Sequence, residues 1–131
     1  MLFERIQELA EKWAPHREGM LKAIEATHGT HNEDDVLAMI LAGSLRLTVS
    51  EKSAIVTEVC TYPRMKALNA FLCSGKLADI IAHEPTLIAL AKEHGCTRVT
   101  FGGIPKWEAA MCQKPNGPGW EVGGVFLYKD I

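Results

Sequence analysis

A helix followed directly by a strand, at residues 83–101 (HEPTLIALAKEHGCTRVTF), constrains the fold more than any other stretch of the chain. Apolar residues recur there at helical spacing from Leu87, and Gly95 follows them as a stop signal. Beyond this glycine, Val99 and Phe101 alternate with polar residues, which is the period of a strand with one buried face. We therefore expect a helix that returns onto the strand after it, in a domain that mixes helices and strands.

The residues before this unit predict three helical segments. Residues 2–13 place apolar side chains on one helical face, and Pro15 interrupts that helix because proline has no N–H to donate. A second helical segment is expected over residues 16–27. A third begins after Asn32, a typical helix cap, and ends at Gly43. The side chains expected to point inward are Leu2, Phe3, Ile6, Leu9, Ala10, Trp13, Met20, Leu21, Ile24, Val36, Met39 and Ile40.

From Ser44 the hydrophobic period changes to that of strands. Three antiparallel strands are predicted, over residues 45–49, 54–61 and 65–73. The third has apolar residues on both faces, with Phe71 on one and Leu72 on the other, which predicts a central strand covered on both sides. Further along, the pattern predicts a short helical piece, the crossover helix, a strand, another short helix and a last strand, over residues 77–82, 83–94, 98–101, 107–112 and 120–131.

These elements predict an α+β fold, with N-terminal helices and helices on both faces of a mixed, mostly antiparallel central sheet. We expect a single domain over residues 1–131, with a helical part at 1–43 and the sheet at 44–131. The formal charge of −2 predicts no general affinity for nucleic acid or anionic membranes. Because there is no signal-peptide pattern and no apolar run of about 18 residues, we expect a cytoplasmic protein.

Neither the cysteines nor the polar stretch THGTHNEDD indicates a metal site. The four cysteines are widely spaced without a Cys-x-x-Cys pair, which favours reduced, buried thiols. Within the polar stretch, His28, His31, Asp34 and Asp35 are residue types that bind metals. The favoured interpretation is that Asn32 caps a helix whose first turn is acidic, since acidic residues there suit the helix dipole. We therefore predict no bound metal.

The order of these elements, with AKEHGCTRVTF in the middle and GWEVGGVFLYKDI at the end, resembles the GNAT superfamily of acyl-CoA-dependent N-acetyltransferases. The likeness spans residues 34–131. The runs SAIVTEVCTYPRMKAL, HEPTLIALAKEHGC and PKWEAA further resemble small GNAT-like proteins of bacteriophages and prophages. The resemblance implies a GNAT-like domain with its coenzyme site beside the central strand.

Family enzymes hold the coenzyme pyrophosphate on a loop of the type Arg/Gln-x-x-Gly-x-Gly/Ala, between the central strand and the next helix. At that place this chain offers one glycine, within Cys73, Ser74, Gly75 and Lys76. The family commonly uses a strand glutamate as base, and Glu58 lies within a predicted strand. Where the family has an acid tyrosine, this chain has Trp107, and Tyr128 does not match that position.

These departures from the family pattern favour a degenerate GNAT-fold protein that acts mainly by protein–protein contacts. It would be a phage or prophage structural, virion-associated or host-interacting protein, located in the host cytoplasm or the virion and needing no cofactor. The alternative is an acetyl-CoA-dependent N-acetyltransferase acting on a small-molecule or protein amine, with Glu58 as base and residues 73–76 binding acetyl-CoA.

Two features of the sequence suggest surfaces for such contacts. Tryptophan is over-represented at interfaces, and the chain contains Trp13, Trp107 and Trp120. We expect Trp13 in the core, while Trp107 and Trp120 are open between core and interface. A homo-oligomer formed through an edge strand is also expected, because a neighbour can extend the predicted final strand.

Overall fold

The computed structural model describes residues 1–102, 111–112 and 119–131. In chain order, the elements are α1 (Leu2–Trp13), the 3-10 helix η1 (Ala14–His16), α2 (Arg17–Glu25), α3 (Glu33–Ala42), β1 (Arg46–Val49), β2 (Ala54–Thr61), β3 (Lys66–Ser74), α4 (Leu77–Ile81), α5 (Glu84–Glu93) and β4 (Arg98–Phe101). The strands form one sheet in the order β1-β2-β3-β4. The first two pairings are antiparallel, whereas β3 and β4 are parallel.

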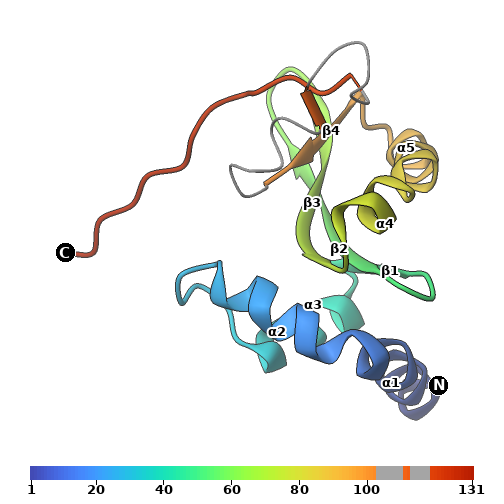
Figure 1. Cartoon of the computed structure of the whole chain (residues 1–131). Coiled ribbons are helices and arrows are strands. Elements are labelled where there is room, and N and C mark those ends of the chain that lie inside the picture. The colour runs from blue at the N-terminus through green and yellow to red at the C-terminus, as the bar shows by residue number, and fades with distance from the viewer. Residues whose placement is uncertain (103–110, 113–118) are drawn as a thin grey trace.

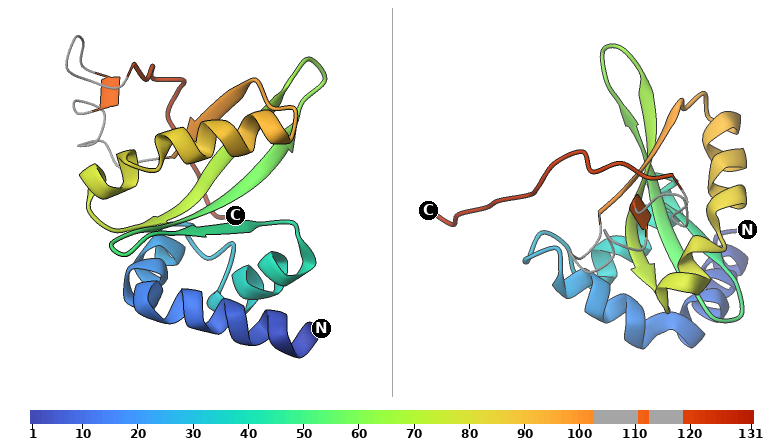
Figure 2. Two further views of the ribbon diagram at one scale, coloured as in Figure 1. Left: turned by 90° about the vertical axis from the view of Figure 1, so that its right-hand side faces the viewer. Right: turned by 45° about the horizontal axis from the view of Figure 1, so that its top comes forward.

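Helices cover both faces of this sheet, which confirms the predicted α+β architecture (Figures 1 and 2). On one face, α1, α2 and α3 enclose a core that includes the fully buried Met20, Val36 and Val56. On the other face, α4 and α5 pack over a second core around Ile55 and Leu68. The strands β2 and β3 are shared by both cores, so the central position predicted for the third strand is confirmed.

The signals that end and begin helices act as the sequence predicts. Pro15 lies in η1, where the α-helix is interrupted between α1 and α2. Asn32 caps α3 by accepting a hydrogen bond from the N–H of Asp35, whose carboxylate accepts one from the N–H of Asn32. Gly43 ends α3 in the left-handed conformation at φ +87°.

The predicted inward face of α1 is wrong over its first two turns. Leu9 and Trp13 are buried, but Leu2, Phe3 and Ile6 are exposed. Figure 2 shows α1 at the outer margin of the helical layer, away from the sheet. Helical periodicity identifies an apolar face but does not say whether another element covers all of it.

The predicted alternation along the third strand is also wrong at one point. Val56 pairs with Leu72 and Thr57 pairs with Ala70, so Phe71 is an extra residue in β3. As a consequence, Phe71 and Leu72 both pack on the side of α1–α3, rather than on opposite faces. A β-bulge restarts the two-residue alternation in this way, because two residues on one strand oppose one on its partner.

The strand predicted over residues 120–131 does not form. These residues have no strand pairing and run away from the sheet in an extended arm (Figure 1). A strand needs a neighbour for its backbone N–H and C=O groups, and none of the described strands pairs with this arm. The expected helix at 107–112 falls mostly outside the described residues, although Met111 and Cys112 are helical.

Candidate functional site

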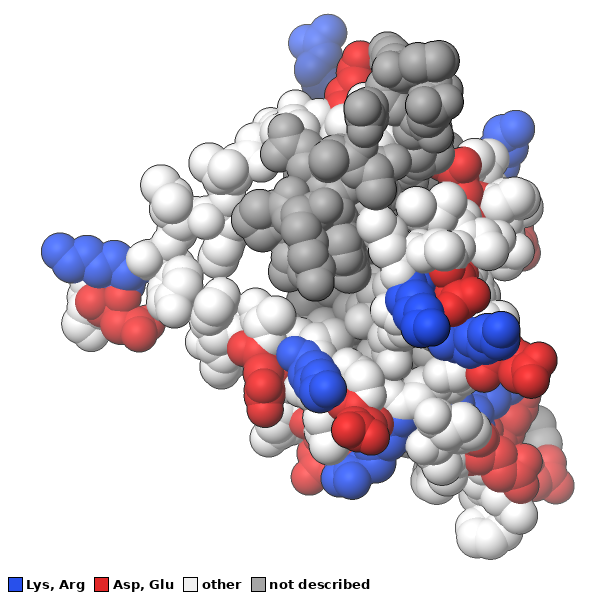
Figure 3. Space-filling model, viewed as in Figure 1, with Lys and Arg blue, Asp and Glu red and all other residues white. Residues whose placement is uncertain are grey.

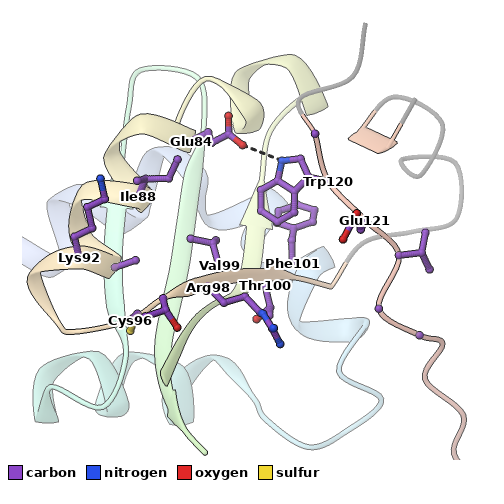
Figure 4. A pocket seen from close by; sticks show the side chains of 16 residues that line it. Glu84, Ile88, Lys92, Cys96, Arg98, Val99, Thr100, Phe101, Trp120 and Glu121 are labelled. Carbon is purple, nitrogen blue, oxygen red and sulfur yellow. Dashed lines mark hydrogen bonds between the residues drawn. The ribbon is translucent and has the colours of Figure 1, made fainter. Parts of the chain in front are cut away.

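A groove of about 960 Å³ runs along the outer edge of β4 (Figure 4). One wall is α5, the floor is β4, and the other wall is the start of the C-terminal arm at residues 119–124. Val99 and Phe101 point toward α5 and pack partly against its core. Ile88 on α5 remains exposed within the groove. The groove therefore has an apolar interior, bordered by charged side chains such as Lys92 and Glu121.

Trp120 fixes the start of the arm over this groove. Its indole N–H donates a hydrogen bond of 3.0 Å to the carboxylate of Glu84, in the first turn of α5. Its ring meets Phe101 edge-on, with 6.1 Å between the ring centroids. Trp120 is thus part of the groove wall. By contrast, Trp13 is buried and donates to Glu33, as expected for a core residue, and Trp107 lies outside the described residues.

The backbone of β4 also presents hydrogen-bonding groups to this groove. The N–H of Thr97 donates to the carbonyl of Lys66 at 3.0 Å, so it points toward β3. The backbone N–H and C=O groups of successive residues in a strand point to opposite sides. The N–H and C=O groups of Arg98 and Thr100 therefore point away from β3. Within the described residues these outward groups have no backbone partner. The groove therefore combines apolar side chains with a strand edge that can accept a further strand.

The residues predicted to hold a coenzyme have local packing roles. Gly75 adopts φ +125°, and a Cβ there would lie 2.8 Å from the carbonyl oxygen of Lys52 and 2.9 Å from the Cβ of Ser53. Ser74 is buried, and its hydroxyl lies so close to Gly19 that a Cβ at that glycine would be 2.0 Å away. The close approach of the β1–β2 turn is sufficient to explain the glycine at 75 without any phosphate.

The neighbours of this turn also bear on coenzyme binding. Burial raises the pKa of the Cys73 thiol to about 12, so the thiol is protonated at neutral pH. Lys76 is exposed, and it precedes α4, which has five residues and receives no side-chain cap. Favourable anion binding at a helix N-terminus depends on free N–H groups and an aligned dipole, and a helix this short aligns few peptide units. Coenzyme binding at residues 73–76 stays a prediction.

Glu58 lies in a polar row across the sheet face opposite α5. Its carboxylate, half-buried, accepts a hydrogen bond of 2.9 Å from the amide of Asn69, and the amide oxygen of Asn69 accepts one of 2.8 Å from the hydroxyl of Thr100. Ser74 lies five positions beyond Asn69 on β3, roughly 17 Å at the rise of a strand. The structure therefore does not bring the predicted base and the predicted coenzyme turn into direct contact.

A buried hydroxyl–imidazole pair has no signal in the sequence. The Ser53 hydroxyl lies 2.6 Å from Nε2 of His83 and 2.9 Å from the hydroxyl of Ser50. Burial, and then the nearby His16, lower the pKa of His83. Serine and histidine together can form a nucleophile, but Ser53 is fully buried and no substrate can reach it. We interpret the pair as a structural link between the β1–β2 turn and the start of α5.

The histidines and Asp35 of the polar stretch before α3 contact other protein groups. His28 stacks on Tyr128, with 4.5 Å between ring centroids, and His31 meets Phe71 edge-on. Asp35 belongs to the cap of α3. Among the described residues, no group of three or more histidine, cysteine, aspartate or glutamate side chains is placed to hold a metal ion.

Comparison of the chain with protein-family models, with curated proteins and with solved structures finds no match. The resemblance to GNAT proteins is therefore neither confirmed nor contradicted by any known relative. No helix in the described part of the chain is both long and apolar enough to cross a membrane.

Proposed function

We propose that this protein is a degenerate GNAT-fold protein that acts mainly through contacts with other proteins. The observation that carries the proposal is the presence of two exposed apolar surfaces. In the C-terminal arm, Val125, Phe126 and Leu127 are 80 to 87% exposed. On α1, Leu2, Phe3 and Ile6 form a second apolar patch. Grouped apolar side chains of this kind are typical of surfaces that bind a partner.

The local packing around Gly75 supports the non-catalytic proposal. In the family, glycines in this loop allow backbone to approach phosphates, whereas here the single glycine is needed for the contact with Lys52 and Ser53. The short α4 that follows gives little further support for an anion. We propose that the partner is a phage or host protein and that the protein works in the host cytoplasm or the virion. We also propose that it forms a homo-oligomer through the edge of its sheet.

A thermal shift experiment tests this proposal against coenzyme binding. A ligand present at about 100 times its dissociation constant stabilises a protein by roughly 2.7 kcal/mol, which raises the melting temperature by several degrees. We expect no shift in millimolar acetyl-CoA. A shift that disappears in Lys76→Glu would contradict the proposal. Lys76 is the suitable position because it is exposed, whereas a side chain at Gly75 would disturb the fold by itself.

One observation favours the alternative of an acetyltransferase. Glu58 is held in place by Asn69 on a mixed sheet in which β3 and β4 are parallel. A carboxylate in a fixed position can act as a base toward an amine. Release of free coenzyme A thiol from acetyl-CoA, measured with a panel of small amines and basic peptides, tests this alternative. Activity that Glu58→Gln abolishes without changing the melting temperature would establish it.

A further inference from the structure

We propose that residues 122–131 of one copy of the chain pair as a strand with the outer edge of β4 in a second copy, and that the exchange is reciprocal. The inference rests on the proposed function through protein contacts, and it names one partner for them. The donor is the C-terminal arm, and the acceptor is the groove between β4 and α5.

The arm has the properties of a strand without a neighbour. It is extended, and it carries no charged residue between Glu121 and Lys129. Figure 3 shows this arm as an uncharged projection with charged side chains at its tip, whereas acidic and basic groups are interspersed on the lower part of the same face. In a strand, Val125 and Leu127 would face one side, and Phe126 and Tyr128 the other. Apolar residues on both sides suit a strand that is covered on both faces.

The edge of β4 has the complementary properties. Arg98 and Thr100 direct backbone N–H and C=O groups into the groove, where the described residues provide no backbone partner. Ile88 and Val99 supply apolar surface beside that edge. An exposed edge of this kind readily pairs with another strand, because main-chain hydrogen bonds give affinity and alternate side chains fill the adjoining surface.

The arm contacts its own chain on either side of its exposed apolar residues 125–127. Trp120 is fixed to Glu84, and Tyr128 stacks on His28, which follows α2. Tyr128 as a whole residue remains 57% exposed, so this stacking covers only part of it. Between these contacts, Gly124 adopts φ +155°, a conformation that side chains disfavour and that allows the chain to leave the groove wall at an angle.

The apolar area also suits a symmetric pair of copies. An aromatic side chain buries about 150–250 Å², so Phe126 and Tyr128 from two copies can together bury roughly 600–1,000 Å². Stable interfaces bury about 1,200–2,000 Å², and Val125, Leu127 and Ile131 add to the aromatic contribution. Because each copy has one donor arm and one acceptor edge, a two-fold exchange satisfies both and forms a closed dimer.

Light scattering coupled to size-exclusion chromatography tests the exchange on the full chain, over a wide range of micromolar concentrations. We expect a species of twice the 14.4 kDa of one chain. The double variant Phe126→Asp with Leu127→Asp should lose the dimer. Arg98→Pro should also lose it, since proline removes an outward N–H yet is tolerated at a sheet edge. The matched control is Phe3→Asp, which removes an equally exposed ring from α1 and should leave the dimer intact.

Mixing the arm variant with the edge variant provides a second test. One has an intact edge and the other an intact arm, so the mixture should recover a dimer with a single exchanged arm. Backbone hydrogen exchange on the unaltered chain provides a third. In the dimer, the amides of Arg98 and Thr100 should exchange at least about ten-fold more slowly than in the monomer. The amide of Thr97, which is bonded to Lys66, should show no such difference.

A monomer at every concentration, or a dimer that survives both the arm and the edge substitutions, overturns the inference. A monomer at every concentration would also contradict the homo-oligomer proposed above, but either result leaves contacts with other proteins as the proposed function. A melting-temperature shift with acetyl-CoA would instead contradict the proposed function and would leave the evidence for strand exchange unaffected. The failure of one proposal is therefore distinguishable from the failure of the other.

Discussion

Replacing Gly75 with alanine tests whether this glycine serves packing or a coenzyme. The new methyl group would lie 2.8 Å from the carbonyl oxygen of Lys52, and the residue would keep φ +125°. An unfavourable backbone conformation costs about 1–3 kcal/mol, and overpacking costs about 1–3 kcal/mol more. We therefore expect Gly75→Ala to lower the free energy of unfolding by about 2–6 kcal/mol.

Gly95→Ala is the matched control for this substitution. Gly95 also has positive φ, at +74°, but a Cβ there would meet nothing within 4 Å. Only the conformational cost applies, about 1–2 kcal/mol. Urea unfolding of both variants separates the two contributions. If Gly75→Ala lowers the free energy of unfolding no more than Gly95→Ala does, the close approach to the β1–β2 turn does not explain the glycine at position 75. Our argument against a phosphate-binding loop there then fails.

Two further predictions concern stability. Asn32→Ala removes the cap of α3 and should lower the free energy of unfolding, measured in urea, by about 1 kcal/mol. Asp34→Ala in the same exposed turn should lower it by only about a few tenths of a kcal/mol. Equal losses in the two variants would contradict the capping role of Asn32. Because the pKa of His83 is lowered below 6.5 in the folded state, the unfolded chain binds protons more readily there. The free energy of unfolding should be retained above about pH 6.5 and fall as the pH drops toward the lowered pKa. Urea unfolding as a function of pH checks this, and His83→Asn should show a smaller fall than the unaltered chain.

Local signals in the sequence were sufficient for most of the fold. The helix α3 has a cap at Asn32 and a stop at Gly43, and both act through backbone contacts within a few residues. The three antiparallel strands follow one another through short turns, so their order is also a local property. The crossover helix α5 and strand β4 lie close to the predicted bounds.

The errors arose where distant contacts decide the structure. The extra residue Phe71 in β3 depends on its register with β2, which hydrophobic alternation within one strand does not report. The arm at residues 120–131 has the composition of a strand but lacks a neighbour in the described part of its own chain. An alternating apolar pattern indicates that a segment can form a strand. It does not show whether a neighbouring strand is present to pair with it.

The candidate site was less predictable than the fold. The sequence identified Trp120 as a possible interface residue, and the structure places it in the wall of the β4 groove. The groove itself could not be predicted, because it requires α5, β4 and the arm to come together in space. The contact between Ser53 and His83 joins residues 30 positions apart and follows no motif.

That same contact has a consequence for how the molecule fluctuates. Ser53 fastens the start of α5 to the β1–β2 turn, while the adjacent strand end, Ser74, reaches the backbone of His16 on the opposite face. Both helical coverings are therefore attached at one end of the sheet. A local opening that breaks the contacts at this end of the sheet releases the helices on both faces together. The two helical layers therefore belong to one cooperative unit and do not unfold separately.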